Sequence, residues 1–247
     1  MPKVSIITPL YNSASYISRT IQSVLDQTFQ DWEMLIVDDC STDKGVDIVK
    51  GIAADEPRIK LLKNQTNSGP ALTRNRGIKA AQGRYIAFLD SDDQWHKDKL
   101  KIQLEFMQKN RVGFTYSYYN HIDEKGNQIS VTNKLPEKVD YVSTMKSNKI
   151  GCLTAMYDVR KFGKVYMRNL KKRQDYTLWL QLLKKTEFAY CVPHILATYT
   201  VRKGSISSNK FSLIKYHWKI YRHIEKQSFL KSLYYLSFYI FARLTRK

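Results

Sequence analysis

The stretch RYIAFLDSDDQ, residues 84–94, joins an apolar run directly to three carboxylates. The apolar run predicts a buried strand. Because residues two apart in an extended chain lie on the same face, Asp90 and Asp92 can point into one cleft while Ser91 faces away. Ionised acids so close together repel each other unless a cation neutralises them, and hard oxygen ligands suit Mg2+ or Mn2+. The stretch predicts a divalent-metal site, with a solvated turn or helix N-terminus as the alternative.

Upstream of this stretch, short apolar runs alternate with amphipathic segments, a pattern typical of βαβ units. The predicted strands cover residues 4–8, 34–37 and 59–62. The predicted helices begin near Asn12 or Ser13, near Ser41 or Thr42, and at Ser68, with Pro70 in the first turn. A later strand over residues 112–119 and a turn at 123–127 predict a hairpin. The pattern indicates an α/β fold with a mostly parallel central sheet.

Polar and aromatic residues follow each predicted strand at the point where it ends. They are Thr8 to Tyr11, Asp38 and Asp39, Asn64 to Asn67, and Asp90 to Asp93. In an open α/β sheet the ligand crevice lies outside the carboxyl ends of the strands. These groups would therefore line one rim, and together they favour a nucleotide site.

Composition limits the class of protein without naming a function. The 247 residues are 43% hydrophobic, enough for a sizeable core. The formal net charge of +19 implies an anionic partner such as a phosphate substrate, an acidic membrane or nucleic acid. Cys40, Cys152 and Cys191 are widely spaced and form no C-x-x-C pattern, which fits a reducing cytoplasm. We read no export signal and no run long enough to span a membrane.

The chain from residue 201 onward carries eleven Lys or Arg against Glu225 alone, interleaved with aromatic residues at helical spacing. Basic and aromatic side chains without a spanning length suit a helix in the headgroup region of an anionic membrane. The alternative is a pair of helices that packs back on the domain or forms a homodimer. No nucleic-acid-binding motif accompanies the charge, so no nucleic-acid partner is expected.

Several segments closely resemble the family 2 inverting glycosyltransferases. In the first half they are VSIITPLYN (4–12), QTFQDWE (27–33), IVDDCSTD (36–43), NSGPALTRNRG (67–77) and FLDSDD (88–93). Further on, RQDYTLWL (173–180) is similar to the acceptor-side motif, and VRKGSIS (201–207) to the closing segment. The resemblance implies a GT-A fold, a nucleotide-diphosphate sugar donor with UDP favoured, Mn2+ or Mg2+, and inversion at the anomeric carbon.

The resemblance also implies a division of the chain and a role for each matching residue. Residues 1–110 would bind the nucleotide sugar, and 111–208 would complete the domain on the acceptor side. The charge and aromatic pattern described above predicts that 209–247 form basic aromatic helices. Asp92 would bind the metal, with Asp93 behind it. The nucleotide site would include Tyr11 stacked on the base, Thr8 and Pro9 around it, Asp39 accepting from the base, Asp90 by the ribose, and Asn67, Ser91, Arg74 and Arg202, with Ser205 beside Arg202.

Asp175 is the expected catalytic base, which takes the proton from the attacking hydroxyl. The alternative is an acid that simply favours a helix N-terminus. Two positions depart from the family pattern, since Gln174 replaces a common Glu and Arg202 a common His; a guanidinium cannot ligate a metal but can hold a diphosphate. Tyr116, Tyr118 and Tyr119 are expected either to line the acceptor groove or to pack in the strand.

The expected function is a glycosyltransferase, peripheral on the cytoplasmic face of the cell membrane, that glycosylates a lipid-linked or growing glycan acceptor in cell-surface polysaccharide synthesis. A HAD-like phosphotransferase, with Asp90 as nucleophile and Asp92 as acid, is one alternative. It needs a small hydroxylated residue soon after the acids, where this chain has Gln94 and Trp95. A non-catalytic basic membrane- or RNA-binding module is the other.

Overall fold

A computed structural model describes residues 1–202 and 210–244 of the chain. Its strands are β1 (Val4–Leu10), β2 (Trp32–Asp38), β3 (Ile59–Lys63), β4 (Tyr85–Phe88), β5 (Gln94–Trp95), β6 (Phe114–Ile122), β7 (Gln128–Thr132), β8 (Lys138–Val139), β9 (Met156–Asp158) and β10 (Ala189–Thr200). Among the described residues these strands form one sheet in the order β3-β2-β1-β4-β9-β6-β10-β5, with β7 beside β6 and β8 beside β10.

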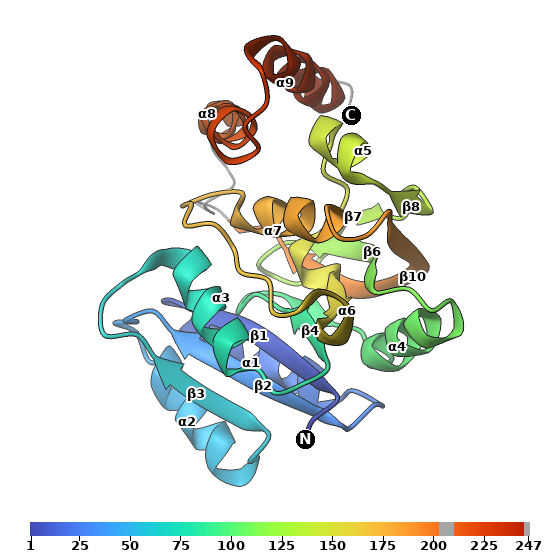
Figure 1. Ribbon diagram of the computed structural model, residues 1–247. Helices are drawn as coiled ribbons and strands as arrows, with labels where there is room; N and C mark the ends of the chain where they lie inside the picture. The colour runs from blue at the N-terminus through green and yellow to red at the C-terminus, as the bar shows by residue number, and fades with distance from the viewer. Residues whose placement is uncertain (203–209, 245–247) are drawn as a thin grey trace.

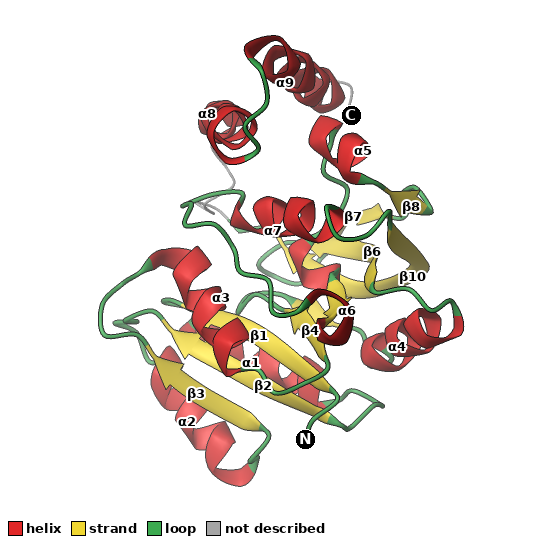
Figure 2. Cartoon of the chain, viewed as in Figure 1, coloured by secondary structure: helices red, strands yellow, loops and turns green. Residues whose placement is uncertain are grey.

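The helices are α1 (Ala14–Leu25), α2 (Gly45–Asp55), α3 (Gly69–Ala80), α4 (Lys99–Lys109), α5 (Tyr141–Lys146), α6 (Val159–Phe162), α7 (Gln174–Leu183), α8 (Lys210–Lys219) and α9 (Phe229–Leu244). A 3-10 turn, η1, spans Cys152–Thr154, and a π-helical turn, η2, spans Ile220–Ile224. Helices cover both faces of the sheet, with α1 and α3 on opposite sides (Figures 1 and 2).

Successive side chains of a strand point to opposite faces of the sheet, so the sheet separates two hydrophobic cores. In β1, Ile7 packs in one core with Ala71 and Ile78 of α3, whereas Val4 and Ile6 pack in the other with residues of α1 and α2. A strand buried on both faces has no polar side, which explains the continuous apolar runs of β1, β2 and β4.

The predicted parallel sheet is confirmed for β3, β2, β1 and β4. Beyond β4 the sheet is mixed, because the short strand β9 runs antiparallel to both β4 and β6, while β10 and β6 are parallel. The hairpin at 123–127 is also confirmed: β6 pairs with β7, and Asp123 accepts hydrogen bonds from the Lys125 and Asn127 amides at 2.9 and 2.8 Å.

The predicted start of the second helix was wrong. α2 begins at Gly45 rather than at Ser41 or Thr42. Asp43 provides the acceptors at this point, with Oδ1 3.0 Å from the Gly45 amide and Oδ2 2.7 Å from the Ala14 amide at the start of α1. One carboxylate therefore binds the N-terminal amides of two helices, and it joins the loops that follow β1 and β2.

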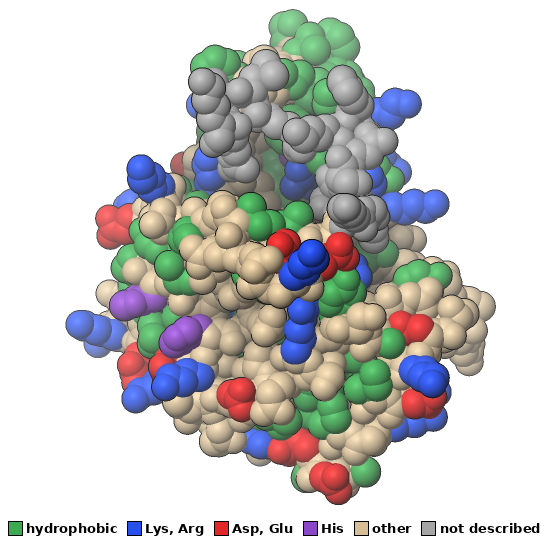
Figure 3. All heavy atoms as spheres, turned by 180° about the vertical axis from the view of Figure 1, so that it is seen from behind, with side chains coloured by type: hydrophobic (Ala, Val, Ile, Leu, Met, Phe, Trp, Pro, Cys, Tyr) green, Lys and Arg blue, Asp and Glu red, His purple; other side chains and the backbone are tan. Residues whose placement is uncertain are grey.

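The C-terminal helices pack against the domain through a buried aromatic and aliphatic cluster. Tyr176 and Leu180 of α7 form a buried cluster with Met145 of α5, Tyr221 of η2 and Tyr235 of α9. The other side of α9 exposes large apolar side chains: Phe229, Leu230, Leu233, Tyr234, Phe238, Ile240 and Phe241. Hydrophobic atoms gather at this end of the molecule in Figure 3. Among the residues described, no helix is both long enough and apolar enough to cross a bilayer.

Candidate active site

Helix α1 holds the loop of aspartates that follows β4. The Thr20 hydroxyl donates to the backbone oxygens of Ser91 and Asp93, at 3.0 and 2.8 Å. The Ser91 hydroxyl donates to the Ser13 hydroxyl at 2.9 Å, and Ser91 is buried. The buried side chain of Ser91 therefore helps to hold the loop, and its expected place in the nucleotide site stays a prediction.

The carboxylates of Asp90 and Asp92 each contact a guanidinium. Arg74 from α3 pairs with Asp90, and Arg202 Nε lies 2.6 Å from Asp92 Oδ2. Burial, and then the charge of Asp90, nevertheless raise the pKa of Asp92. The two acids still repel each other in the presence of both arginines, so the pair suits a further cation.

The donor set fits a divalent ion that is shared with a ligand. In the described part of the chain, no three His, Cys, Asp or Glu side chains are grouped so that they could hold a metal alone. Mg2+ is commonly bound by one or two carboxylates together with substrate phosphates. Asp90 and Asp92, both partly exposed, provide oxygens of the required type.

Asp93 lies behind these acids. It is 1% exposed, and its Oδ1 accepts from the Thr200 amide at 2.9 Å. Burial, and then the charges of Asp92 and Asp90, raise the pKa of Asp93 well above its ordinary value. The Thr200 hydroxyl also donates to the backbone oxygen of Asp92 at 2.5 Å. The end of β10 is thereby attached to the aspartate loop, a connection that motif matching missed.

The predicted binding site for the nucleobase lies at the ends of β1 and β2. Tyr11 is 51% exposed, Pro9 is half-buried and Thr8 is fully buried, so Thr8 can shape the site only from beneath. Asp39 is buried and accepts from the Ser68 and Gly69 amides, both at 2.8 Å.

The carboxylate of Asp39 therefore already holds the loop before α3. Asn64 Nδ2 also donates to this carboxylate, at 2.7 Å, and the Asn67 side chain donates to the Asp39 backbone oxygen at 3.2 Å. These bonds join the loops after β2 and β3 at the rim of the sheet where the nucleobase was expected to bind.

Asp175 lies half-buried in the first turn of α7. Trp179, one turn further along, packs edge-on against Phe88 of β4, with ring centroids 5.7 Å apart. Burial lowers the pKa of Arg74, but the charge of Asp90 and its hydrogen bond, with a smaller contribution from the charge of Asp175, outweigh burial and raise the pKa above its usual value. Asp175 is thus within electrostatic range of the Asp90–Arg74 pair, although it comes from the other half of the chain.

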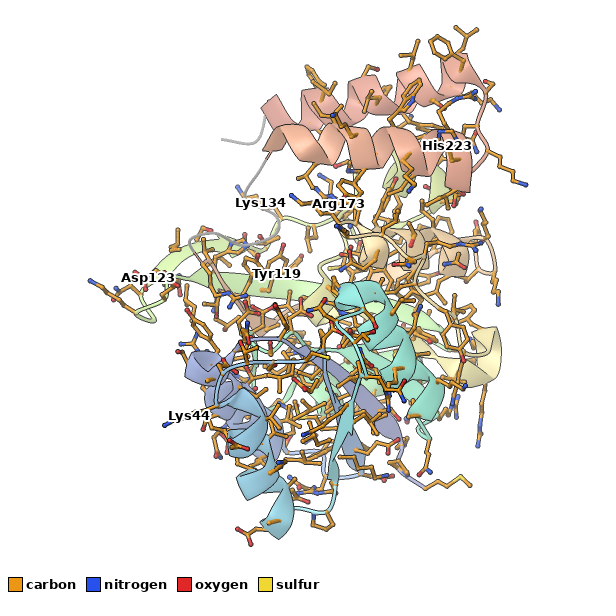
Figure 4. All side chains as sticks on the ribbon, turned by 90° about the vertical axis from the view of Figure 1, so that its left-hand side faces the viewer. Lys44, Tyr119, Asp123, Lys134, Arg173 and His223 are labelled. Carbon is orange, nitrogen blue, oxygen red and sulfur yellow. The ribbon has the colours of Figure 1, made fainter. Side chains whose placement is uncertain are left out.

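The three tyrosines of β6 do not line one groove. Tyr116 is fully buried, and its hydroxyl donates to the Pro136 backbone oxygen at 2.7 Å, so of the two alternatives it packs in the strand. Tyr118 packs on the same core as Tyr116, and Tyr119 on the opposite one, because neighbours in a strand face opposite ways. Figure 4 labels Tyr119 on β6, Asp123 at the tip of the hairpin and Arg173 before α7. Ser205 lies outside the described residues.

Comparison with known proteins decides the family. The family model described as Glycosyl transferase family 2 matches residues 5–165. The chain belongs to glycosyl transferase family 2. It is a glycosyltransferase, which sets aside the phosphotransferase and the non-catalytic module.

Two relatives of this family 2 enzyme match it over almost its whole length. TuaG of Bacillus subtilis strain 168, a candidate teichuronic acid biosynthesis glycosyltransferase, is 45% identical over 94% of this chain and 92% of its own. WfgD of Escherichia coli, named as a UDP-Glc:alpha-D-GlcNAc-diphosphoundecaprenol beta-1,3-glucosyltransferase, is 40% identical over 96% and 92%.

Two solved structures share the GT-A fold of this family 2 chain. TarS of S. aureus (residues 1–349) in complex with UDP-GlcNAc has a TM-score of 0.73 at 23% identity, covering 90% of this chain and 67% of that one. The mannosyltransferase PcManGT from Pyrobaculum calidifontis, in complex with GDP-Man and Mn2+, has a TM-score of 0.71 at 16% identity, covering 95% and 70%. At these identities the likeness establishes the fold alone.

Proposed function

We propose that this enzyme transfers a sugar from a UDP-sugar to a lipid-linked or growing glycan acceptor in cell-surface polysaccharide synthesis. The name of WfgD, which gives a UDP-glucose donor and a diphosphoundecaprenol-linked acceptor, supports this choice. In the proposal, residues 1–110 bind the donor, 111–208 complete the acceptor side of the same domain, and 209–247 attach the enzyme to the membrane.

The donor half would hold the nucleotide between its loops. Tyr11 offers an exposed ring on which a base can stack. Asp92 would hold Mn2+ or Mg2+, which neutralises the charge on the leaving diphosphate, and Asp90 would lie by the ribose. Arg74 and Arg202 carry the guanidinium groups whose planar forks match phosphate oxygens.

Asp175 would act on the acceptor. The acceptor hydroxyl oxygen attacks the anomeric carbon as the bond from that carbon to the diphosphate breaks, and Asp175 takes the hydroxyl proton. The observation that carries this proposal is the pair of arginine–aspartate contacts after β4, Arg74 with Asp90 and Arg202 with Asp92, beside the helix α7, which carries Asp175 and packs on β4 through Trp179.

The test is Asp175→Asn, measured by nucleotide release in a donor screen with Mn2+. Turnover should fall by roughly a hundred- to ten-thousand-fold, because a general base contributes about that much. UDP affinity should stay near that of the wild type. Asp47→Asn is the matched control, since Asp47 is also an acid in the first turn of a helix but is exposed. Near-normal turnover of Asp175→Asn, or loss of UDP binding, would contradict the assignment.

Membrane attachment on the cytoplasmic face of the cell membrane belongs to the same proposal. The exposed apolar side of α9, beside Lys226 and Lys231, has the composition of a surface that enters the headgroup region. A lipid-linked acceptor lies at that surface, so attachment would bring the acceptor and the catalytic cleft together.

A further inference from the structure

Arg202 contacts the carboxylate of Asp92, which is also the proposed metal ligand. Its Nε atom lies 2.6 Å from Asp92 Oδ2, but it lacks the alignment of a hydrogen bond and has no other partner among the described residues. The contact is therefore a charge contact with little directional stabilisation. Its side chain is 30% exposed, whereas that of Arg74 is 6% exposed and also donates to the Pro70 backbone oxygen. Of these two arginines, Arg202 is the one with room to move.

Tyr16 of α1 keeps the Arg202 guanidinium near this carboxylate. The guanidinium carbon of Arg202 lies 5.1 Å from the centre of the Tyr16 ring, and that of Arg19 lies 4.8 Å from it. The Tyr16 hydroxyl donates to Glu124 Oε1 at 2.8 Å, which ties the ring to the β6–β7 hairpin. An aromatic face attracts a guanidinium without fixing its rotation. The ring can thus hold Arg202 both when it pairs with Asp92 and when it turns away.

The backbone two residues before Arg202 is attached to the aspartate loop. At this position, Thr200 is bonded through its amide to Asp93 and through its hydroxyl to the backbone of Asp92. Arg19 Nη2 donates to the same hydroxyl at 3.3 Å. Arg202 therefore stays within reach of the aspartate loop in either position.

We infer that Arg202 is a counter-ion for Asp92 that gives way to the metal, and that Tyr16 positions it for this exchange. A divalent ion that binds alone must displace the guanidinium from the Asp92 carboxylate. When a nucleoside diphosphate binds as well, the phosphates give Arg202 a new partner. Metal and nucleotide binding are then coupled through one side chain. This inference rests on the proposed metal role of Asp92.

The test measures Mn2+ affinity by EPR of the free ion, with and without UDP. Arg202→Gln should bind Mn2+ alone about five-fold or more tightly than the wild type, and UDP should then improve its affinity less, since coupling between ligands is reciprocal. Tyr16→Leu should shift both quantities in the same direction by a smaller factor. Tyr16→Phe keeps the ring and should stay near the wild type.

Arg19→Gln is the charge-matched control. It removes an equal positive charge beside the same ring, that of Tyr16, but Arg19 contacts Thr200 rather than Asp92. Its Mn2+ affinity should change clearly less than that of Arg202→Gln, because Arg19 does not occupy the carboxylate that the metal would use. Equal effects of Arg19→Gln and Arg202→Gln would overturn the inference while leaving the metal site standing. If the wild type does not bind Mn2+ even with UDP, both the proposed metal site and this inference are wrong. Melting temperatures of all variants verify folding.

Discussion

The exposed side of α9 allows a quantitative prediction about membrane binding. Phe229, Leu230 and Phe241 are 57, 77 and 66% exposed, equivalent together to two fully exposed large side chains. Moving one such side chain out of water is worth about 1.5–3 kcal/mol. Replacing all three with serine should therefore remove about 3–6 kcal/mol of transfer free energy, which weakens partitioning onto vesicles by on the order of a hundred-fold or more.

Co-sedimentation with anionic and neutral vesicles, at low and high salt, measures this effect. The wild type should sediment with anionic vesicles and less so at high salt, because each basic residue near the surface adds about 1 kcal/mol that salt screens. Ile129→Ser is the control, since Ile129 is 55% exposed on β7, outside α9. Wild-type protein that stays in the supernatant, or a triple variant that sediments like the wild type, refutes the reasoning. Deleting the helices is a poorer test because it uncovers Tyr176 and Leu180.

Three further predictions concern stability, each measured by urea or thermal unfolding. Burial lowers the pKa of Lys99 to about 7, so the unfolding free energy should rise between about pH 7 and pH 10, where the unfolded chain binds more protons. Lys99→Met should lose this rise of the unfolding free energy with pH. A variant that keeps the same rise would contradict the prediction. Gly77→Ala should destabilise by about 1–3 kcal/mol, because a Cβ would lie 2.7 Å from Ile7 Cγ2; a stabilised variant would show that α3 can shift. Trp179→Ala should cost about 3–5 kcal/mol, since the ring is fully buried; a loss below 1 kcal/mol would contradict that packing.

Local patterns predicted the parallel half of the fold because its signals are local. Each of β1 to β4 is an apolar run followed by polar residues, and periodicity detects runs of that length. β9 has only three residues, Met156–Asp158, too few to show any period. Its position between β4 and β6 depends on contacts between distant segments, which a local pattern does not contain. The start of α2 was missed for another reason, since the capping group comes from Asp43 and not from the first hydroxyl residues of the loop.

The candidate site, too, could be predicted where its signals are local and not where it depends on contacts between distant segments. The rule that ligands lie at the carboxyl ends of strands predicted that Asp39 and Asp90 would lie at one rim. It could not predict which side chains were already in use, such as Asp39 by the amides before α3 or Ser91 by Ser13. The pairing of Arg202 with Asp92 joins residues far apart in the chain, so it depends on how β10 packs beside the aspartate loop.

The packing of α7 on β4 explains how the two halves of the site keep their relative position. Asp175 and Trp179 are four residues apart, so they lie on the same face of α7. Trp179 packs against Phe88, which lies two residues before Asp90, and against Phe114 of β6 with ring centroids 5.4 Å apart. The helix that carries Asp175 is thereby held against the end of β4 by a buried aromatic contact. Because this contact is buried, the separation between the proposed base and the donor carboxylates is determined by the core and not by a surface loop.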